Sequence, residues 1–250
     1  MAFQSKKFSK FMATAATAVL VATAVAPAAS AVTTFKDVPE TSKYKEATDF
    51  LVTKGVKGFK DGTFGFNQNI TRADAAVMLA NVLELDIEGA PSAGFTDVNP
   101  RFEKHVNALY AAGITKGAGN NKFNSFAEIT RGELAIWIQK AFNLKATNTK
   151  IAFTDVDVRY TDAVAALVEN KVTLGKTTTS FGTTAQATRG EYALFLHRAF
   201  LIEDQPTLDS ALKEAEQAIA ALPSAEDFTE DHFGLFYTVS DKIEKVIDLE

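Results

Sequence analysis

The sequence predicts a mainly α-helical protein in which one helix-turn-helix module occurs three times in tandem, with a helical tail after the third copy. Three observations predict this fold class. The motif Thr-Arg-x-Asp/Glu occurs three times, and a Phe-x-Asp-Val tetrapeptide precedes each copy at a nearly constant distance. The residues after each motif have the apolar spacing of an amphipathic helix. A unit that recurs in this way is one structural module used repeatedly. The arginines of the motif are Arg72, Arg131 and Arg189, which are 59 and 58 residues apart.

The first helix of each module follows the Phe-x-Asp-Val tetrapeptide. Glycines at Gly55 and Gly113 predict where this helix ends in the first two modules, whereas Lys171 stands at the corresponding place in the third. A polar turn that contains glycine comes next. One phenylalanine follows each turn, and we expect its ring to enter the core as the chain turns back: Phe64, Phe123 and Phe181.

The second helix of each module is the element that the sequence predicts best. Its apolar residues follow steps of 3, 1, 3 and 1, which place them on one stripe of a helix. We interpret this stripe as core, because two short helices cannot bury both their stripes alone, whereas three packed modules can. The stripes are Ala75, Met78, Leu79, Val82 and Leu83; Leu134, Trp137, Ile138, Ala141 and Phe142; and Tyr192, Phe195, Leu196, Ala199 and Phe200.

The start of the second helix carries the repeated polar motif. Its threonine fits the N-cap position, and the acid three residues later completes a capping box, so helix initiation explains both. The arginine between them is not explained in this way. A cation in the first turn opposes the helix dipole, which favours anions there by about 0.3–1 kcal/mol. The same unfavourable choice in three copies indicates a compensating interaction.

Two explanations of the arginines remain open. In the structural one, each arginine pairs with an acidic side chain of its own or a neighbouring module, and the expected partners are Asp37, Asp97 and Asp155 of the Phe-x-Asp-Val tetrapeptides. In the functional one, each arginine joins free backbone N–H groups at the helix start to hold an external anion. The two explanations are compatible if the acid orients the arginine.

The first 31 residues are typical of a secretory signal peptide. Three lysines precede an apolar run over residues 12–26, and an A-x-A cleavage site follows at residues 29–31. The alternative is a transmembrane anchor, but the run is shorter than the roughly 20 apolar residues that cross a bilayer. Cleavage removes three lysines and no acid, so the net charge changes from −5 to −8. We therefore expect a secreted protein that has no membrane contact after cleavage.

The composition excludes several function classes. The chain has no cysteine, so no disulfide can hold it, and its acidic balance argues against nucleic acid as a partner. The three histidines, His105, His197 and His232, lack the spacing of metal ligands. The sequence contains no Gly-x-Ser-x-Gly motif and no phosphate-binding loop. We expect no enzyme activity, no cofactor and no metal.

The repeated pattern resembles the S-layer homology (SLH) domain family. The residues that carry the resemblance are Phe35-x-Asp-Val38, Asp61-Gly62-Thr63-Phe64 and Ile70-Thr-Arg-x-Asp74, with their counterparts in the other two repeats. The resemblance covers residues from about 33 to 203 and is similar to the N-terminal region of bacillus-type S-layer proteins. It implies three modules with pseudo-threefold symmetry around a central helical bundle, and grooves between modules that bind a secondary cell-wall polysaccharide.

The resemblance also implies which residues bind. In the family the recognised group is a pyruvate ketal on a terminal sugar, an anion that the motif arginine contacts. The glycines of the groove would let a sugar approach the backbone, two lysines would add a second cation, and acids would orient the arginines. The implied polysaccharide-binding residues are Arg72, Arg131, Arg189, Gly58, Gly117, Gly175, Lys57, Lys116, Asp37 and Asp97.

The predicted organisation is a signal peptide at 1–31, SLH repeats at 32–90, 91–149 and 150–203, and a helical tail at 204–250. Two apolar stripes in the tail, near 208–222 and 233–247, predict a helical hairpin that serves as a spacer or binds a partner. Repeat three lacks the glycine before its turn, has Thr177-Thr178-Thr179 in place of an Asp-Gly turn, and has Ala187 where the other repeats have isoleucine. We therefore expect its groove to be the weakest or purely structural.

We expect this secreted protein to be anchored non-covalently to a Gram-positive cell wall, with self-association in a surface array as a further possibility. One alternative is a structural S-layer or protein-interaction subunit. The other is an SLH-anchored cell-wall hydrolase whose catalytic part lies in the tail.

Overall fold

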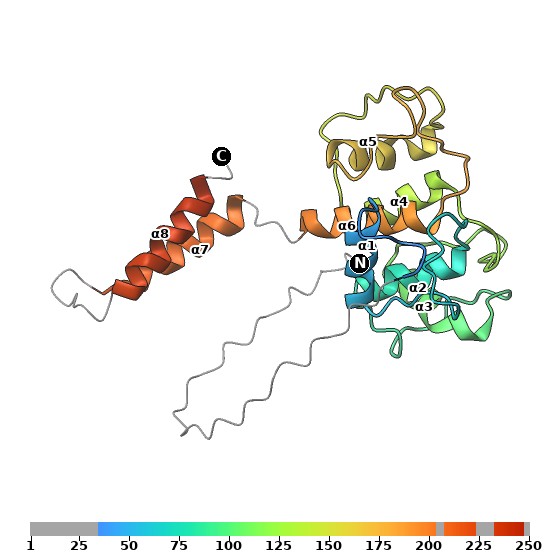
Figure 1. Cartoon of the computed structure of the whole chain (residues 1–250), viewed down its shortest axis with the longest axis horizontal. Helices are drawn as coiled ribbons and strands as arrows, with labels where there is room; N and C mark the ends of the chain where they lie inside the picture. The colour runs from blue at the N-terminus through green and yellow to red at the C-terminus, as the bar shows by residue number, and fades with distance from the viewer. Residues whose placement is uncertain (1–34, 204–207, 224–232, 248–250) are drawn as a thin grey trace, which may run out of the picture. The chain divides into compact units, whose positions relative to one another are not determined.

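The computed structural model describes residues 35–203, 208–223 and 233–247 (Figure 1). The predicted signal peptide lies outside these residues. The chain divides into two compact units, Met1–His197 and Arg198–Glu250. Within the described residues, no helix has the length and apolar character needed to cross a membrane.

The described residues confirm the mainly α-helical class. Each repeat contributes two helices, and isolated bridges rather than named strands connect the loops between them. The helices are α1 (Lys45–Thr53), α2 (Arg72–Val82), α3 (Pro100–Ala111), α4 (Arg131–Ala141), the 3-10 helix η1 (Val158–Tyr160), α5 (Thr161–Glu169), α6 (Arg189–Glu203), α7 (Leu208–Ala220) and α8 (Phe233–Ile247).

The first helices end where the sequence predicts. Gly55 and Gly113 follow α1 and α3 with φ angles of +76° and +74°, the left-handed conformation that glycine adopts most easily. Lys171 adopts the same conformation after α5, with φ +59°. A side chain there costs about 1–2 kcal/mol, so repeat three keeps the shape of the turn at some expense of stability.

The predicted core is confirmed at its main positions. The turn residues Phe64, Phe123 and Phe181 are fully buried, and each lies against the phenylalanine of its own Phe-x-Asp-Val tetrapeptide. The predicted stripes of the second helices are buried except at three positions near the helix ends, which are partly exposed: Leu83, Ala141 and Phe200.

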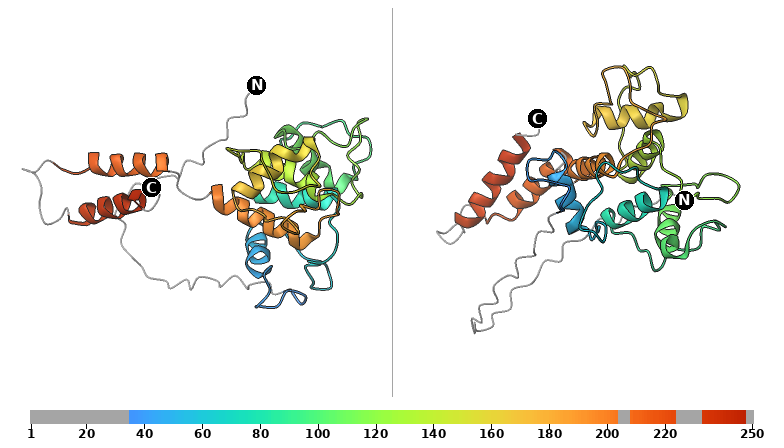
Figure 2. Two further views of the ribbon diagram at one scale, coloured as in Figure 1. Left: turned by 90° about the horizontal axis from the view of Figure 1, so that it is seen from above. Right: turned by 45° about the vertical axis from the view of Figure 1, so that its right-hand side comes forward.

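The helices pack between repeats. The second helix of repeat one, α2, packs against α3 of repeat two, and α4 packs against α5 of repeat three (Figures 1 and 2). The rings of Phe50 on α1 and His197 on α6 lie 5.0 Å apart, so repeat three also contacts repeat one. The contacts therefore close into a ring in which each repeat meets both others.

Three backbone hydrogen bonds close the same ring at its centre. Ile70 N–H donates to the Ala187 carbonyl (2.9 Å), Ala187 N–H to the Ile129 carbonyl (3.0 Å), and Ile129 N–H to the Ile70 carbonyl (3.1 Å). These residues come just before the Thr-Arg motifs, so the three second helices start from a common centre. These three bonds do not by themselves establish the predicted pseudo-threefold symmetry around a helical bundle, which stays a prediction.

In the second unit, α7 and α8 pack against each other, as the predicted tail hairpin requires. Ala215 and Val239 are buried, and Lys242 forms an ion pair with Glu214 at 2.8 Å.

Loss of a helix cap is the first testable consequence. The Thr130 hydroxyl accepts from Glu133 N–H at the start of α4, so Thr130→Ala should lower the free energy of unfolding by about 1–2 kcal/mol. Urea unfolding followed by the fluorescence of the single tryptophan, Trp137, measures the change. Thr184→Ala, at an exposed loop position, is the control. Equal losses in both variants would contradict the role of the cap.

Candidate anion-binding groove

The helix start of repeat two forms a complete capping box. The Thr130 hydroxyl accepts from Glu133 N–H at 3.3 Å, and a Glu133 carboxylate oxygen accepts from Thr130 N–H at 3.0 Å. The same two bonds join Thr188 and Glu191 in repeat three. In repeat one the Thr71 hydroxyl accepts from Asp74 N–H at 3.1 Å. The Asp74 carboxylate accepts from the Thr71 hydroxyl at 2.7 Å, so the threonine cap is confirmed in all three repeats and the full capping box in repeats two and three.

The expectation of free N–H groups at the helix starts is wrong. Arg131 N–H donates to the Ala185 carbonyl and Gly132 N–H to the Thr183 carbonyl, both at 3.0 Å. The loop of the next repeat crosses the helix start and supplies these carbonyls. The other two starts are closed in the same way: Arg72 N–H donates to Ala127 and Ala73 N–H to Ser125, while Arg189 N–H donates to Gln68 and Gly190 N–H to Phe66.

The arginine side chains also reach the next repeat. Arg72, Arg131 and Arg189 are only 4%, 2% and 6% exposed. Each Nε–H donates to the carbonyl of a turn phenylalanine, in Phe123, Phe181 and Phe64 respectively, at 2.8–2.9 Å. The rings of the same phenylalanines lie 4.9–5.3 Å from the guanidinium carbons, so a cation–π contact accompanies each hydrogen bond.

Two of the arginines form ion pairs with the motif acid of the next repeat. Arg72 Nη1 lies 2.6 Å from Glu133 Oε1, and Arg131 Nη1 lies 2.9 Å from Glu191 Oε1. Repeat one has Asp74 at this position. The Asp74 side chain is one methylene shorter than glutamate. Its negative charge and that of Asp37 interact electrostatically with the Arg189 guanidinium. Burial lowers the pKa of Arg131 and Arg189, and the neighbouring carboxylates oppose that shift.

The predicted ion pairs with Asp37, Asp97 and Asp155 are wrong. These carboxylates instead accept backbone N–H groups of the turn in their own repeat. Asp97 accepts from Phe123 and Asn124, at 2.7 and 2.9 Å. The same arrangement joins Asp37 to Phe64 and Gly65, and Asp155 to Phe181 and Gly182. Each aspartate thus holds the phenylalanine whose carbonyl receives an arginine, so it positions the arginine indirectly.

The three predicted groove glycines have an internal explanation. A Cβ atom at Gly58, Gly117 or Gly175 would lie 2.4, 2.3 or 2.6 Å from a ring atom of the Phe-x-Asp-Val phenylalanine in the same repeat. The close approach of that ring excludes a side chain. The further role of these glycines in admitting a sugar stays a prediction.

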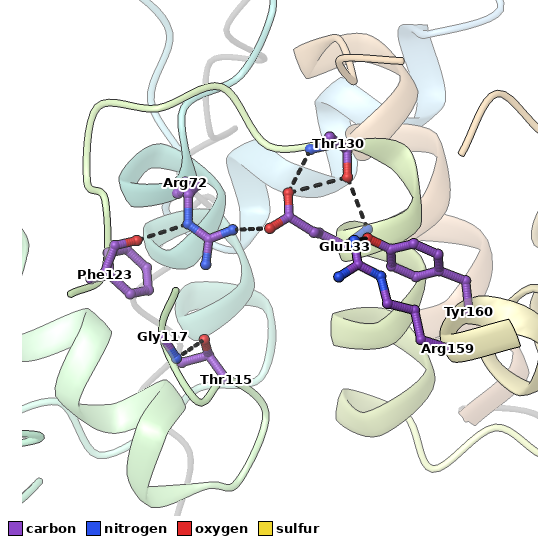
Figure 3. Close-up of polar contacts among 8 residues, drawn as sticks. All are labelled: Arg72, Thr115, Gly117, Phe123, Thr130, Glu133, Arg159 and Tyr160. Carbon is purple, nitrogen blue, oxygen red and sulfur yellow. Dashed lines mark hydrogen bonds and ion pairs between the residues drawn. The ribbon is translucent and has the colours of Figure 1, made fainter. Parts of the chain in front are cut away.

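One groove gathers three of the predicted binding residues from two repeats. Its volume is about 210 Å³. Repeat one contributes Arg72, and repeat two contributes the turn with Lys116 and Gly117. Figure 3 shows Arg72 directed toward Glu133, with the Thr115–Gly117 turn below and Arg159 and Tyr160 beyond Glu133. The remaining lining residues are Ile114, Thr115, Glu133, Ile136, Trp137, Lys140, Arg159 and Tyr160.

The groove has a surplus of positive charge. Four cationic side chains line it, and Glu133, the acid among the lining residues, is already paired with Arg72. Burial and the nearby Lys116 ammonium lower the pKa of Lys140, so the positive charge of Lys140 is disfavoured at this position. The Arg159 guanidinium lies 4.3 Å from the Tyr160 ring centroid and donates to the Tyr160 hydroxyl. A hollow with surplus cations and convergent donors suits an anionic ligand.

Other predicted site residues lie elsewhere. Arg131 and Arg189 belong to the two other contacts between repeats, and Gly58, Gly175 and Lys57 do not line this groove. Sequence reasoning missed Lys140, Arg159 and Tyr160. A signal for the last two was present, because a basic–aromatic pair recurs at intervals of 58 residues, as Lys43-Tyr44, Arg101-Phe102 and Arg159-Tyr160.

Acid should weaken the turns that hold the arginines. Burial opposes the charge on Asp97 and Asp155, but their N–H donors outweigh it, so the pKa of each is lowered. A lowered folded-state pKa stabilises the fold above the unfolded value of about 3.9, and this stability is lost as the pH falls through the folded pKa. We expect the urea midpoint, followed by Trp137 fluorescence, to fall between pH 5 and pH 3.

Asp97→Asn should lower the midpoint at pH 7 and reduce its dependence on pH. Asp241→Asn, at an exposed position of α8, should leave both unchanged. If the urea midpoint of Asp97→Asn depended on pH as strongly as that of the wild-type protein, Asp97 would not contribute to this dependence.

The buried arginines should be essential to stability. Arg131→Ala leaves the Phe181 carbonyl and the Glu191 carboxylate without their partner, so we expect a loss of about 3 kcal/mol in the free energy of unfolding. Arg101→Ala removes an exposed guanidinium that lies over the Phe102 ring and should cost less than about 1 kcal/mol. Thermal and urea unfolding of the two variants test the difference, and similar losses would mean that burial of Arg131 contributes little.

Comparison with known proteins agrees with the repeated motifs. The S-layer homology domain model matches residues 34–76, 94–135 and 152–193, which together make up just over half of the chain. Each stretch contains one Phe-x-Asp-Val tetrapeptide and the Thr-Arg motif that follows it.

Several relatives share the repeat region. An S-layer protein of Bacillus licheniformis is 34% identical over 144 residues, 57% of this chain and 16% of that protein. S-layer protein EA1 of Bacillus anthracis is 34% identical over 144 residues, 57% of this chain and 17% of that protein. A Bacillus anthracis protein named an uncharacterized cell wall amidase is 31% identical over 112 residues, 44% of this chain and 21% of its own length.

The matches to the two S-layer proteins thus span about a sixth of the length of those relatives. The chain belongs to the S-layer homology domain family, as its repeated motifs predicted.

Proposed function

We propose that the three repeats anchor this protein non-covalently to the cell wall by binding an anionic, pyruvylated secondary cell-wall polysaccharide. The observation that carries the proposal is the groove at Arg72, where Lys116, Lys140 and Arg159 surround a single carboxylate that is already paired. Burial and the charge of Lys116 lower the pKa of Lys140, and an anion bound there would offset the part that comes from Lys116.

A pyruvate ketal suits this groove chemically. Its carboxylate is compact and permanently charged at neutral pH, and it can accept hydrogen bonds from ammonium and guanidinium groups together. Tyr160 and Trp137 also line the groove, but each is only 4% exposed and a guanidinium lies over its ring, so the charged groups rather than the ring faces carry recognition. A volume of about 210 Å³ suits one terminal sugar rather than a long stretch of polymer.

The amidase name of one relative favours a second candidate, a cell-wall hydrolase. The two candidates differ in a direct assay. A hydrolase releases amino groups or sugars from purified walls during incubation, whereas an anchor binds the walls and leaves their composition unchanged. A structural subunit that binds other proteins would sediment equally with walls stripped of the secondary polymer.

Exposed groove residues give the cleanest test of anchoring. Lys116→Gln and Arg159→Gln should each weaken co-sedimentation with purified walls about tenfold, because each loses one ionic hydrogen bond worth about 1.4 kcal/mol. Lys116 and Arg159 are exposed, so thermal unfolding should show intact folds. The control is Lys145→Gln, at an exposed position that does not line the groove. Arg72 is less suitable, because its removal also disrupts Glu133 and the Phe123 carbonyl.

Walls without the secondary polymer, and walls without its pyruvyl groups, complete the experiment. The wild-type protein should lose binding to both. Retention on stripped walls would refute polysaccharide anchoring, and full binding to walls without pyruvyl groups would refute the choice of anion.

A further inference from the structure

The helical hairpin of the second unit has one open apolar face. α7 and α8 lie side by side (Figure 2) and pack along a seam in which Ala215 and Val239 are buried. A helix of a bundle presents an apolar stripe wider than one row, and more than one neighbouring helix covers it. The apolar rows beside this seam are exposed, and their position on each helix shows which face they form.

On α7 the exposed apolar residues lie to one side of the seam. An α-helix turns by about 100° per residue, so Leu212 and Ile219 stand about 60° and 40° round the helix from Ala215, in the same direction. Their exposed fractions are 42% and 49%. Glu214 stands about 100° round in the opposite direction, and it pairs with Lys242 of α8 at 2.8 Å. The ion pair and the apolar row therefore lie on opposite sides of the hairpin.

The residues of α8 divide in the same way. Ile243 and Ile247 stand about 40° and 80° round the helix from Val239, and they are 41% and 62% exposed. Lys242 stands about 60° round in the opposite direction. Because its ion pair with Glu214 joins the two helices on one side, the rows that lie away from the ion pair share the other side. We call this side the open face: Leu212, Ile219, Ile243 and Ile247.

Glutamates border the open face on both helices. Glu216 of α7 and Glu244 of α8 stand about 100° and 140° round from the seam, on the side of the open face, and both are exposed. The exposed lysines point elsewhere. Lys245 lies on the side of the ion pair, and Lys213 stands about 160° from the seam, on the side of α7 that is turned away from α8. The open face is thus apolar at its centre and negative at its two edges.

These edges decide between two possible occupants. Two copies of the hairpin stacked face to face would bring the glutamates of one copy close to those of the other, and like charges at an interface cost energy. The four partly exposed side chains also supply only part of the roughly 800 Å² that each partner buries in a standard interface. A single helix needs less area, and basic residues beside its apolar stripe would meet Glu216 and Glu244.

The spacing of the open face also fits one helix. Leu212 and Ile219 are two turns apart, about 10.5 Å along α7, and Ile243 and Ile247 are about one turn apart. Between these two rows lies the small side chain of Ala215, so the rows form the walls of a shallow groove. An amphipathic helix binds such a groove through apolar residues that recur every three or four positions.

We propose that the open face of the α7–α8 hairpin binds a basic amphipathic helix of another protein, with apolar residues in the groove and lysine or arginine beside Glu216 and Glu244. This surface belongs to the second unit and does not depend on the binding of polysaccharide.

A pair of synthetic peptides tests the proposal. Each is a fluorescently labelled helix of about 21 residues with leucine at positions a and d of three heptads. One carries lysine at positions e and g, and the other carries glutamate there. Titration with the full chain, followed by fluorescence anisotropy, should show binding of the lysine peptide and at least about tenfold weaker binding of the glutamate peptide. Equal binding of the two peptides, or binding of neither, would overturn the proposal.

Matched substitutions locate the binding surface. Ile243 and Leu235 lie four residues to either side of Val239 and are both 41% exposed, but Leu235 lies on the side of the ion pair. Ile243→Ser should weaken binding of the lysine peptide about tenfold, and Leu235→Ser less than about twofold. Far-ultraviolet circular dichroism checks that both variants keep their helices. Equal weakening by the two substitutions would overturn the choice of face.

Two further measurements test the charge and the occupant. Glu216→Lys should weaken binding of the lysine peptide about fivefold, whereas Asp241→Lys, on the side of α8 turned away from α7, should have less than about half that effect. Sedimentation of the full chain alone should show no dimer that depends on Ile243. A dimer that Ile243→Ser dissociates would mean that a second copy covers the open face, and the proposal would be wrong.

Discussion

The rest of the structure depends on one contact, in which the loop of the next repeat completes each helix start. At α4 the first two N–H groups donate to Ala185 and Thr183, and the guanidinium of Arg131 donates to Phe181. An isolated helix leaves its first N–H groups without partners. Here a different repeat satisfies them, and the contacts return from repeat three to repeat one. A single repeat would leave its first N–H groups and its guanidinium exposed to solvent, so each helix start is completed only where two repeats meet.

The same contact explains an arginine where the helix dipole favours an anion. The unfavourable dipole term is about 0.3–1 kcal/mol, and Arg131 offsets it with a carbonyl, a carboxylate and the faces of two phenylalanine rings. A lysine could not hold carbonyl and carboxylate at once in fixed directions, whereas the planar guanidinium can. The structural and functional explanations are compatible, because Arg72 makes these internal contacts and also lines the groove.

Local features could be predicted from the sequence, and contacts between repeats could not. The threonine caps, the glycine helix ends and the burial of Phe64 follow from interactions within a few residues or from periodicity. The partner of Arg72 does not. Asp97 and Glu133 both recur with the module, so the period cannot tell whether a side chain meets its own repeat or the next. Only the path of the loop across the helix start selects Glu133. For the same reason, no short-range pattern brings Arg159 to the groove.

Comparison of the three copies within this chain distinguishes the positions that join the repeats from the exposed positions that vary. The positions that join the repeats keep their chemistry in every copy: the threonine, the arginine, the acid and the turn phenylalanine. Closure of the ring requires this, because a fault at one contact leaves buried polar groups unpaired in two repeats. The turn position before the repeated glycine is not constant, as Lys57, Lys116 and Leu174 show, and all three residues are exposed. Their side chains are not needed to close the ring, so they were free to diverge. A ring built from one repeated module can therefore vary at its exposed turn positions while the contacts that join its repeats stay the same.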